Sequence, residues 1–216
     1  IYSTLSSILE SGDEVLLFDP AFDCYVPAIK WKGAIPVRLN LDPTSYKVNW
    51  EKVNAKISQK TKILILNNPH NPSGSVFDQE DIEEIKAIVR KYPNLILLSD
   101  EVYEYISFQP HLSFNLYPEL AERAIIVSSF GKTLHLTGWK TGYIVAPENL
   151  LEKVLQLHQF NVFSVNSFSQ EVIAQFLSLD KVKALTPLFK EKQDLFLEGI
   201  KDSRFKAIPS KGTYFQ

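Results

Sequence analysis

Six short apolar segments recur along the chain, and helical stretches lie between several of them. Each segment is shorter than a typical helix and reads as a buried strand. Alternation of such strands with helices favours a mostly parallel sheet, with helices on both faces and right-handed connections. The sequence therefore predicts an α/β fold with three layers, α/β/α. The expected strands are 14–18, 35–39, 63–66, 95–98, 125–127 and 143–145.

The helices are predicted from capping signals and from apolar periodicity. Between the third and fourth strands, Asp78 can cap a helix whose apolar positions repeat about every 3.6 residues before Pro93 ends it. These positions are Ile82, Ile85, Ile88 and Val89. Helices are also expected at 148–159, 167–178 and 181–201, followed by a short strand at 205–208 and the start of another strand at 211–216.

Composition excludes several classes of partner. The formal net charge is −2, and no run of Lys or Arg is dense enough for nucleic acid or an anionic membrane surface. The longest apolar runs are far shorter than the roughly 20 residues that span a bilayer. Cys24 is the only cysteine, so no internal disulfide is expected, and no Cys and His cluster has the spacing of a zinc site. We expect a small-molecule partner, no metal and a cytoplasmic location.

Polar segments follow three of the expected strands. Residues 67–74 read Asn-Asn-Pro-His-Asn-Pro-Ser-Gly, residues 99–104 read Ser-Asp-Glu-Val-Tyr-Glu, and residues 128–133 read Ser-Ser-Phe-Gly-Lys-Thr. In an open parallel sheet, ligands bind beyond the carboxyl ends of the strands. The three segments should therefore bring an amide, a carboxylate, a phenol, hydroxyls and a lysine to one edge of the sheet.

The lysine in the last segment is a candidate for covalent chemistry. The sequence Gly131-Lys132-Thr133 resembles part of a nucleotide-binding P-loop, but that motif needs a glycine at position 126, which is Ile. A desolvated lysine with a lowered pKa is what Schiff-base chemistry needs. Lys132 is therefore a candidate imine former. Most lysines are simply solvated, so the alternative for this residue alone is an exposed loop lysine.

The three segments, in this order and spacing, resemble those of fold-type I, class I pyridoxal-phosphate-dependent aminotransferases. Asp23-Cys-Tyr25 after Pro20-Ala-Phe22 is similar to the kynurenine, glutamine and methionine aminotransferase branch. The resemblance covers nearly the whole chain. It implies pyridoxal 5'-phosphate as the cofactor, an amino acid and a 2-oxo acid as substrates, and a homodimer for the full-length protein.

The resemblance implies that Lys132, Asp100 and Tyr103 are the catalytic residues. Lys132 would form the Schiff base with the cofactor and later move the substrate proton. Asp100 would keep the pyridine nitrogen protonated, and that positive charge should keep Asp100 ionised. Asn71 and Tyr103 would donate hydrogen bonds to the cofactor's phenolic oxygen. The alternatives are a helix cap or surface acid for Asp100, a turn residue for Asn71 and an ordinary half-buried aromatic for Tyr103.

Four further residues receive roles from the resemblance. Ser129 and Lys140 correspond to positions that bind the cofactor's phosphate, and Lys140 stands where many aspartate-type relatives carry arginine. Phe22 would stack on the pyridine ring. Phe163 aligns with a branch position that reaches the neighbouring subunit's substrate pocket. The alternatives are a solvated loop lysine for Lys140 and core packing for the two phenylalanines.

Several features indicate a piece of a longer protein. The chain contains no methionine, and both ends look cut. The family's phosphate loop before the first helix and its carboxylate-binding arginine in the C-terminal small domain have no counterpart here. We expect residues 1–204 to be the cofactor-binding large domain without its N-terminal part, and residues 205–216 to begin the small domain. By itself this chain should hold the cofactor weakly and have little or no activity.

The leading hypothesis is an aminotransferase that moves an amino group from a neutral or aromatic amino acid, of methionine, glutamine or kynurenine type, to a 2-oxo acid. A carbon–sulfur β-lyase of the same fold is an alternative, because such site residues set up one carbanion and the pocket decides its fate. A non-catalytic, cofactor-binding sensor domain is a second alternative, although the basic helix-turn-helix segment expected beside it is not found in this chain. An inert fragment is the third.

Overall fold

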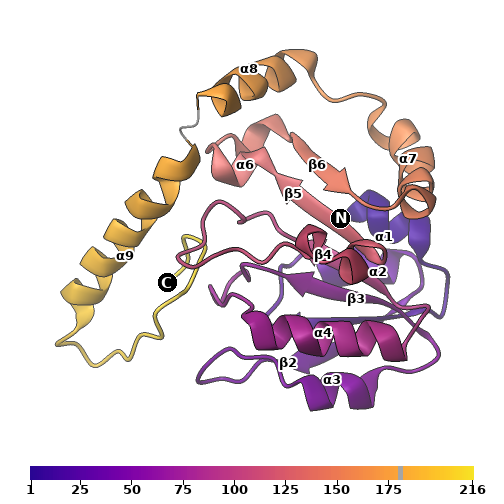
Figure 1. Ribbon diagram of the computed structural model, residues 1–216, viewed down its shortest axis with the longest axis horizontal. Coiled ribbons are helices and arrows are strands. Elements are labelled where there is room, and N and C mark those ends of the chain that lie inside the picture. Colours follow the sequence, from indigo (N-terminus) through magenta and orange to yellow (C-terminus); the bar gives the residue numbers. More distant parts are fainter. Residues whose placement is uncertain (180–181) are drawn as a thin grey trace.

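The structure, a computed structural model, describes residues 1–179 and 182–216. In these residues, six strands form one sheet in the order β2-β1-β3-β4-β5-β6. The first five strands pair in parallel, and β6 is antiparallel to β5. The predicted, mostly parallel sheet is confirmed (Figure 1). The strands are β1 (Glu14–Asp19), β2 (Ile35–Asn40), β3 (Thr61–Asn67), β4 (Ile96–Asp100), β5 (Ala124–Ser129) and β6 (Gly142–Val145).

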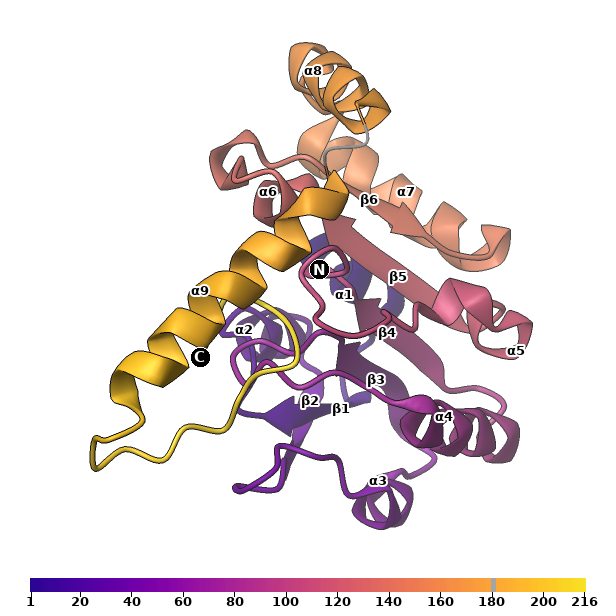
Figure 2. The same ribbon diagram turned by 60° about the vertical axis from the view of Figure 1, so that its left-hand side comes forward.

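Side chains that alternate along the strands pack on two opposite faces of the sheet. On β1, Leu16 and Phe18 belong to one apolar cluster, whereas Val15 and Leu17 belong to the other. Helices cover both faces, so the predicted α/β/α arrangement is confirmed (Figures 1 and 2). The main helices are α3 (Trp50–Lys56) and α4 (Gln79–Lys91) on the first face, and α1 (Tyr2–Ile8), α2 (Tyr25–Trp31) and α7 (Glu148–Val162) on the second.

Helix α4 begins and ends where the sequence predicts. The Asp78 carboxylate accepts hydrogen bonds from the backbone N–H groups of Glu80 and Asp81, and the Asp81 carboxylate accepts one from the Asp78 N–H. This capping box satisfies N–H groups that the first helical turn leaves unpaired. The helix ends at Lys91, before Pro93. Its buried residues are the predicted Ile82, Ile85, Ile88 and Val89.

The C-terminal helices agree with the predicted pattern except at their ends. Helix α7 continues past residue 159 to Val162, and α8 (Ser167–Ser178) has the predicted bounds. Residue 181, where the third helix was expected to begin, lies outside the described residues. From residue 182 the chain forms a short 3-10 helix and then α9. The remaining elements are η1 (Phe114–Leu116), α5 (Pro118–Ala121), α6 (Phe130–Thr133), η2 (Thr137–Trp139), α8 (Ser167–Ser178), η3 (Val182–Ala184) and α9 (Leu185–Ile200).

The two strands predicted near the C-terminus are wrong. Residues 205–208 are irregular, because no strand in the described part of the chain pairs with this segment. The side chain of Phe205 is exposed. Residues 211–216 form only one isolated bridge, between Gly212 and Ser107. Their backbone groups bond to loops instead: the Lys211 N–H donates to the Gly74 carbonyl over 2.8 Å, and the Thr213 N–H to the Ile106 carbonyl over 2.6 Å.

Gly74 allows the C-terminal segment to pass this close. Its φ is +67°, and a Cβ atom there would lie 2.2 Å from the Cβ of Ser210. A side chain at position 74 would therefore force the segment away. The expected boundary between a large domain, 1–204, and a small domain, 205–216, stays a prediction. Within residues 1–179 and 182–216, none of the helices is long and apolar enough to cross a bilayer.

Candidate active site

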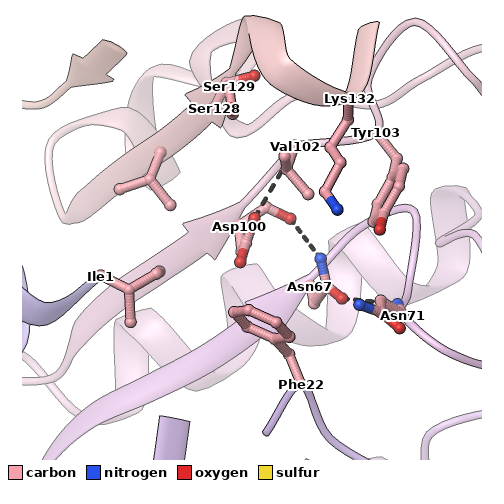
Figure 3. A pocket seen from close by; sticks show the side chains of 11 residues that line it. Ile1, Phe22, Asn67, Asn71, Asp100, Val102, Tyr103, Ser128, Ser129 and Lys132 are labelled. Atoms are coloured by element: carbon pink, nitrogen blue, oxygen red, sulfur yellow. Dashed lines mark hydrogen bonds between the residues drawn. The ribbon is translucent and has the colours of Figure 1, made fainter. Parts of the chain in front are cut away.

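The carboxyl ends of β3, β4 and β5 lie side by side at one edge of the sheet. Asn67, the last residue of β3, pairs in register with Asp100 at the end of β4, and Asp100 pairs with Val127 on β5. Lys132 follows β5 on the short helix α6. This register places the three polar segments around one pocket of about 220 Å³, as the sequence predicts (Figure 3).

The predicted site residues gather in this pocket, with the exception of Lys140 and of Phe163, which is exposed. The amino group of Lys132 points into the pocket between Asp100 and Tyr103 (Figure 3). Apolar walls come from Val102, Val127 and the aromatic ring of Phe22. The predicted residues that line the pocket are Phe22, Asn71, Asp100, Tyr103, Ser129 and Lys132.

Asp100 is buried and accepts a short hydrogen bond from a second buried side chain. The hydroxyl of Tyr25 donates to Oδ2 of Asp100 over 2.6 Å, and the backbone N–H of Val102 donates to Oδ1 over 3.3 Å. Burial raises the pKa of Asp100, and the hydrogen bond from Tyr25 opposes that rise by stabilising the ionised form. Burial, together with the neighbouring Asp100, also raises the pKa of Tyr25, so Tyr25 keeps its proton and acts as the donor.

The side chain of Asn67 connects the backbone of Asp100 to the loop that carries Asn71. Its Nδ2 donates to the backbone carbonyl of Asp100 over 2.8 Å, and its Oδ1 accepts from the Asn71 N–H over 2.7 Å (Figure 3). Both bonds are made within the pocket wall. Asn67 therefore fixes the position of Asn71 relative to β4.

Tyr103 has a buried hydroxyl that bonds to none of the described residues. Its side chain is fully buried, and its ring packs edge-to-face against Tyr214 at a centroid distance of 5.4 Å. Burial, together with the neighbouring phenol of Tyr214, raises the pKa of Tyr103, so the phenol of Tyr103 remains protonated. An unpaired buried donor costs about 1–3 kcal/mol, so this hydroxyl is suited to donate to a ligand in the pocket.

The C-terminal segment brings an aromatic ring next to the candidate lysine. Nζ of Lys132 lies 5.9 Å from the ring centroid of Tyr214, at the outer limit of a cation–π contact. Tyr214 also contacts Tyr103, so its ring packs against two residues of the site without lining the pocket itself. Sequence reasoning gave this segment no functional role.

The residues proposed to bind phosphate are less well placed. Oγ of Ser129 accepts a hydrogen bond from the Gly131 N–H over 3.1 Å and so caps α6, although Ser129 also lines the pocket. Lys140 is exposed and does not line the pocket. Its own backbone is left-handed, with a φ of 54°. The phosphate-binding roles of Ser129 and Lys140 stay predictions. Elsewhere in the described ranges, no group of three or more His, Cys, Asp or Glu side chains could hold a metal ion.

The fold agrees with comparisons to known proteins. The model of one protein family, described as "Aminotransferase class I and II", matches residues 2–216. The chain belongs to this family. The methionine aminotransferase of Escherichia coli (strain K12) is 40% identical over 219 residues, which cover 100% of this chain and 56% of that protein. A kynurenine–oxoglutarate transaminase of Dictyostelium discoideum is 36% identical over 237 residues, and the match covers 100% of this chain and 54% of that protein.

Solved aminotransferase structures have the same fold. The crystal structure of YbdL from Escherichia coli, for which a methionine aminotransferase function has been identified, superposes with a TM-score of 0.95 and 39% identity. The match covers 99% of this chain and 56% of that one. The chain thus spans about half the length of the class I and II aminotransferases that it matches.

Within this aminotransferase fold, sequence reasoning missed Tyr25 and Asn67. Tyr25 belongs to the motif Asp23-Cys-Tyr25, and Asn67 begins the polar segment 67–74, but neither residue was given a role. A signal existed for each: Asn67 is an amide at the end of a buried strand, and Tyr25 follows Phe22 by about one helical turn. Their partners could be identified only from the three-dimensional structure.

Proposed function

We propose that the full-length protein is a pyridoxal-phosphate-dependent aminotransferase that moves an amino group from a neutral or aromatic amino acid to a 2-oxo acid. One observation carries the proposal: the amino group of Lys132 faces one pocket together with the Asp100 carboxylate and the unpaired Tyr103 phenol. A primary amine, a buried acid and a phenol donor are the groups that this chemistry needs. Membership of the aminotransferase family supports the same reaction.

The residues present fit pyridoxal phosphate. The unpaired hydroxyl of Tyr103 matches a phenolic oxygen that accepts a hydrogen bond. The buried carboxylate of Asp100 matches a protonated pyridine nitrogen, because an opposite charge offsets the cost of burial. The ring of Phe22 supplies a flat apolar surface at the pocket wall. When bound, the cofactor supplies an electron sink for the carbanion at the substrate Cα.

The catalytic side chains would then have separate tasks. Lys132 would attach the cofactor through Nζ and afterwards move a proton at the substrate Cα, a type of positioned acid/base step worth about 10²–10⁴-fold in rate. Asp100 would hold the proton on the pyridine nitrogen. Tyr103 and the side-chain amide of Asn71 would donate hydrogen bonds toward the phenolic oxygen.

The pocket walls favour a neutral amino donor. Phe22, Val102 and Val127 are apolar, and among the described lining residues Lys132 is the only cation. An acidic substrate side chain would therefore find no second positive charge in this part of the site. The relatives named as methionine aminotransferase and kynurenine–oxoglutarate transaminase support this donor class.

Product analysis of the full-length protein tests this function. The protein would be mixed with methionine, glutamine, kynurenine or aspartate and with a 2-oxo acid, and the products identified by mass spectrometry. We expect amino transfer to the 2-oxo acid, with the neutral donors favoured over aspartate. A cysteine conjugate tests the β-lyase alternative: release of thiol and pyruvate without a 2-oxo acid, in the absence of amino transfer, would show that the proposed function is wrong.

We also propose that the full-length protein forms a homodimer and is cytoplasmic. Three large aromatic side chains on and beside α7 and α8 are strongly exposed: Phe160 by 86%, Phe163 by 85% and Phe168 by 71%. Large exposed apolar side chains can mark a protein–protein interface. Light scattering should give the mass of a dimer, and Phe163→Asp should weaken it; a monomer at high concentration would contradict this part of the proposal.

A further inference from the structure

We propose that Tyr25 is a positioning residue of this site, which holds Asp100 in its ionised form and supports Phe22, so that both are ready to receive the cofactor ring. The proposal rests on the proposed function, because it concerns the same pocket. Tyr25 does not line the pocket. It therefore acts through residues that do.

The geometry places Tyr25 behind both pocket residues. Tyr25 is the first residue of α2, it is 3% exposed, and its hydroxyl donates to Oδ2 of Asp100 over 2.6 Å. Its ring packs edge-to-face against Phe22, with the centroids 5.5 Å apart and the planes at 85°. One side chain thus contacts the candidate acid for the pyridine nitrogen and the candidate ring for stacking.

The hydroxyl of Tyr25 favours the ionised form of Asp100 through electrostatics. Burial favours the neutral form of Asp100, and among the described side chains only Tyr25 donates a hydrogen bond to this carboxylate. Without that hydroxyl, the remaining donor is the N–H of Val102 at 3.3 Å, and the pKa of Asp100 should rise. A larger fraction of Asp100 would then be protonated, and the pyridine nitrogen would lose its charged partner.

Other charged and titratable groups also act on Asp100. They are the carboxylate of Glu101, the phenol of Tyr103 and the amino group of Lys132, which Figure 3 shows near Asp100. All three groups remain in a Tyr25→Phe variant. A difference between this variant and the wild type therefore isolates the Tyr25 hydroxyl.

The first experiment measures pyridoxal phosphate binding by full-length Tyr25→Phe, without substrate. The substitution keeps the ring against Phe22 and removes only the hydroxyl. Because a hydrogen bond to a charged group is being lost, we expect the Kd near neutral pH to rise about tenfold, which corresponds to about 1.4 kcal/mol. The acid limb of the binding profile should also move to higher pH, because Asp100 becomes easier to protonate.

A matched control separates this effect from a general loss of packing. The hydroxyl of Tyr92 donates to the backbone carbonyl of Asn54 over 3.2 Å, on the other face of the sheet. Tyr92→Phe should lower the unfolding free energy slightly and leave the cofactor Kd and its pH profile unchanged. If Tyr25→Phe behaves in the same way, Tyr25 is structural and the proposal is wrong.

A double-mutant cycle with Asp100→Asn tests whether Tyr25 acts through Asp100. The neutral amide removes the charge that Tyr25 is proposed to maintain. We expect Tyr25→Phe to add little to the Kd of Asp100→Asn, whereas fully additive effects would overturn the proposal. A wild-type protein that binds no pyridoxal phosphate would overturn the proposed function as well. Normal wild-type binding with an unchanged Tyr25→Phe profile would overturn this proposal alone.

Discussion

The side chain of Asn67 donates from Nδ2 to the backbone carbonyl of Asp100 over 2.8 Å and so ties the ends of β3 and β4 together at the site. The same side chain accepts a hydrogen bond from the N–H of Asn71 over 2.7 Å. Asn67→Ala leaves both buried backbone groups without these partners. We expect urea denaturation to show a loss of about 2 kcal/mol in unfolding free energy.

A second asparagine, remote from the pocket, provides the comparison for Asn67. Asn54 on α3 donates from its side chain to the carbonyl of Trp50 over 3.3 Å, at a partly buried position away from the pocket. Asn54→Ala should change the unfolding free energy by no more than about 0.5 kcal/mol. Equal effects of the two substitutions would contradict the role given to Asn67.

The unpaired hydroxyl of Tyr103 leads to opposite expectations for stability and function. Tyr103→Phe removes a buried donor that bonds to none of the described residues, so the cofactor-free protein should become more stable by up to about 1 kcal/mol. The same change removes a donor for the cofactor, so kcat should fall about tenfold. Denaturation of the cofactor-free protein and steady-state kinetics measure the two effects.

Tyr143 serves as the comparison for Tyr103, because its phenol has a hydrogen-bond partner. Its hydroxyl donates to the carboxylate of Glu104, which also accepts from Ser128. Tyr143→Phe should therefore destabilise the cofactor-free protein. Destabilisation by Tyr103→Phe as well would show that the Tyr103 hydroxyl has a partner in the cofactor-free state.

His70 should make the stability of the fold depend on pH. Burial lowers the pKa of His70 to about 4, from an unfolded value near 6.5, so the folded state keeps this ring neutral. The stabilisation of the folded state by the neutral His70 ring is fully present above about pH 6.5 and is lost progressively as the pH falls toward about 4. The difference corresponds to about 3 kcal/mol in unfolding free energy.

Two substitutions test the contribution of His70. His70→Gln should flatten the decline of unfolding free energy between about pH 6.5 and about pH 4. Ser73→Ala removes the hydroxyl that lies 2.8 Å from Nδ1 of His70 but keeps the ring, so the decline should remain. An equal slope in His70→Gln and the wild type would contradict this assignment.

Much of the fold could be predicted because its signals are local. The apolar runs of β1 and β3 are read directly from the sequence, and Asp78 caps α4 through groups within three residues. The strands expected at 205–208 and 211–216 were wrong for a non-local reason. The backbone of Lys211 bonds to Gly74, and a residue's own neighbours do not reveal such a partner.

The candidate site could also be predicted from the sequence only in part. Asp100 and Lys132 could be placed together because parallel strands bring their carboxyl ends to one edge. Tyr25 could not, because its partner Asp100 lies 75 positions away and on a different element. Lys140 was assigned by resemblance, and its side chain lies outside the pocket lining.

Covalent labelling tests the central assignment, that Lys132 holds the cofactor. The full-length protein would be mixed with pyridoxal phosphate, reduced with borohydride and digested, and the modified lysine located by mass spectrometry. We expect the label on Lys132, no label in Lys132→Ala, and an unchanged label in Lys153→Ala on the exposed side of α7. Label spread over surface lysines, or equal labelling of Lys132→Ala, would contradict the account.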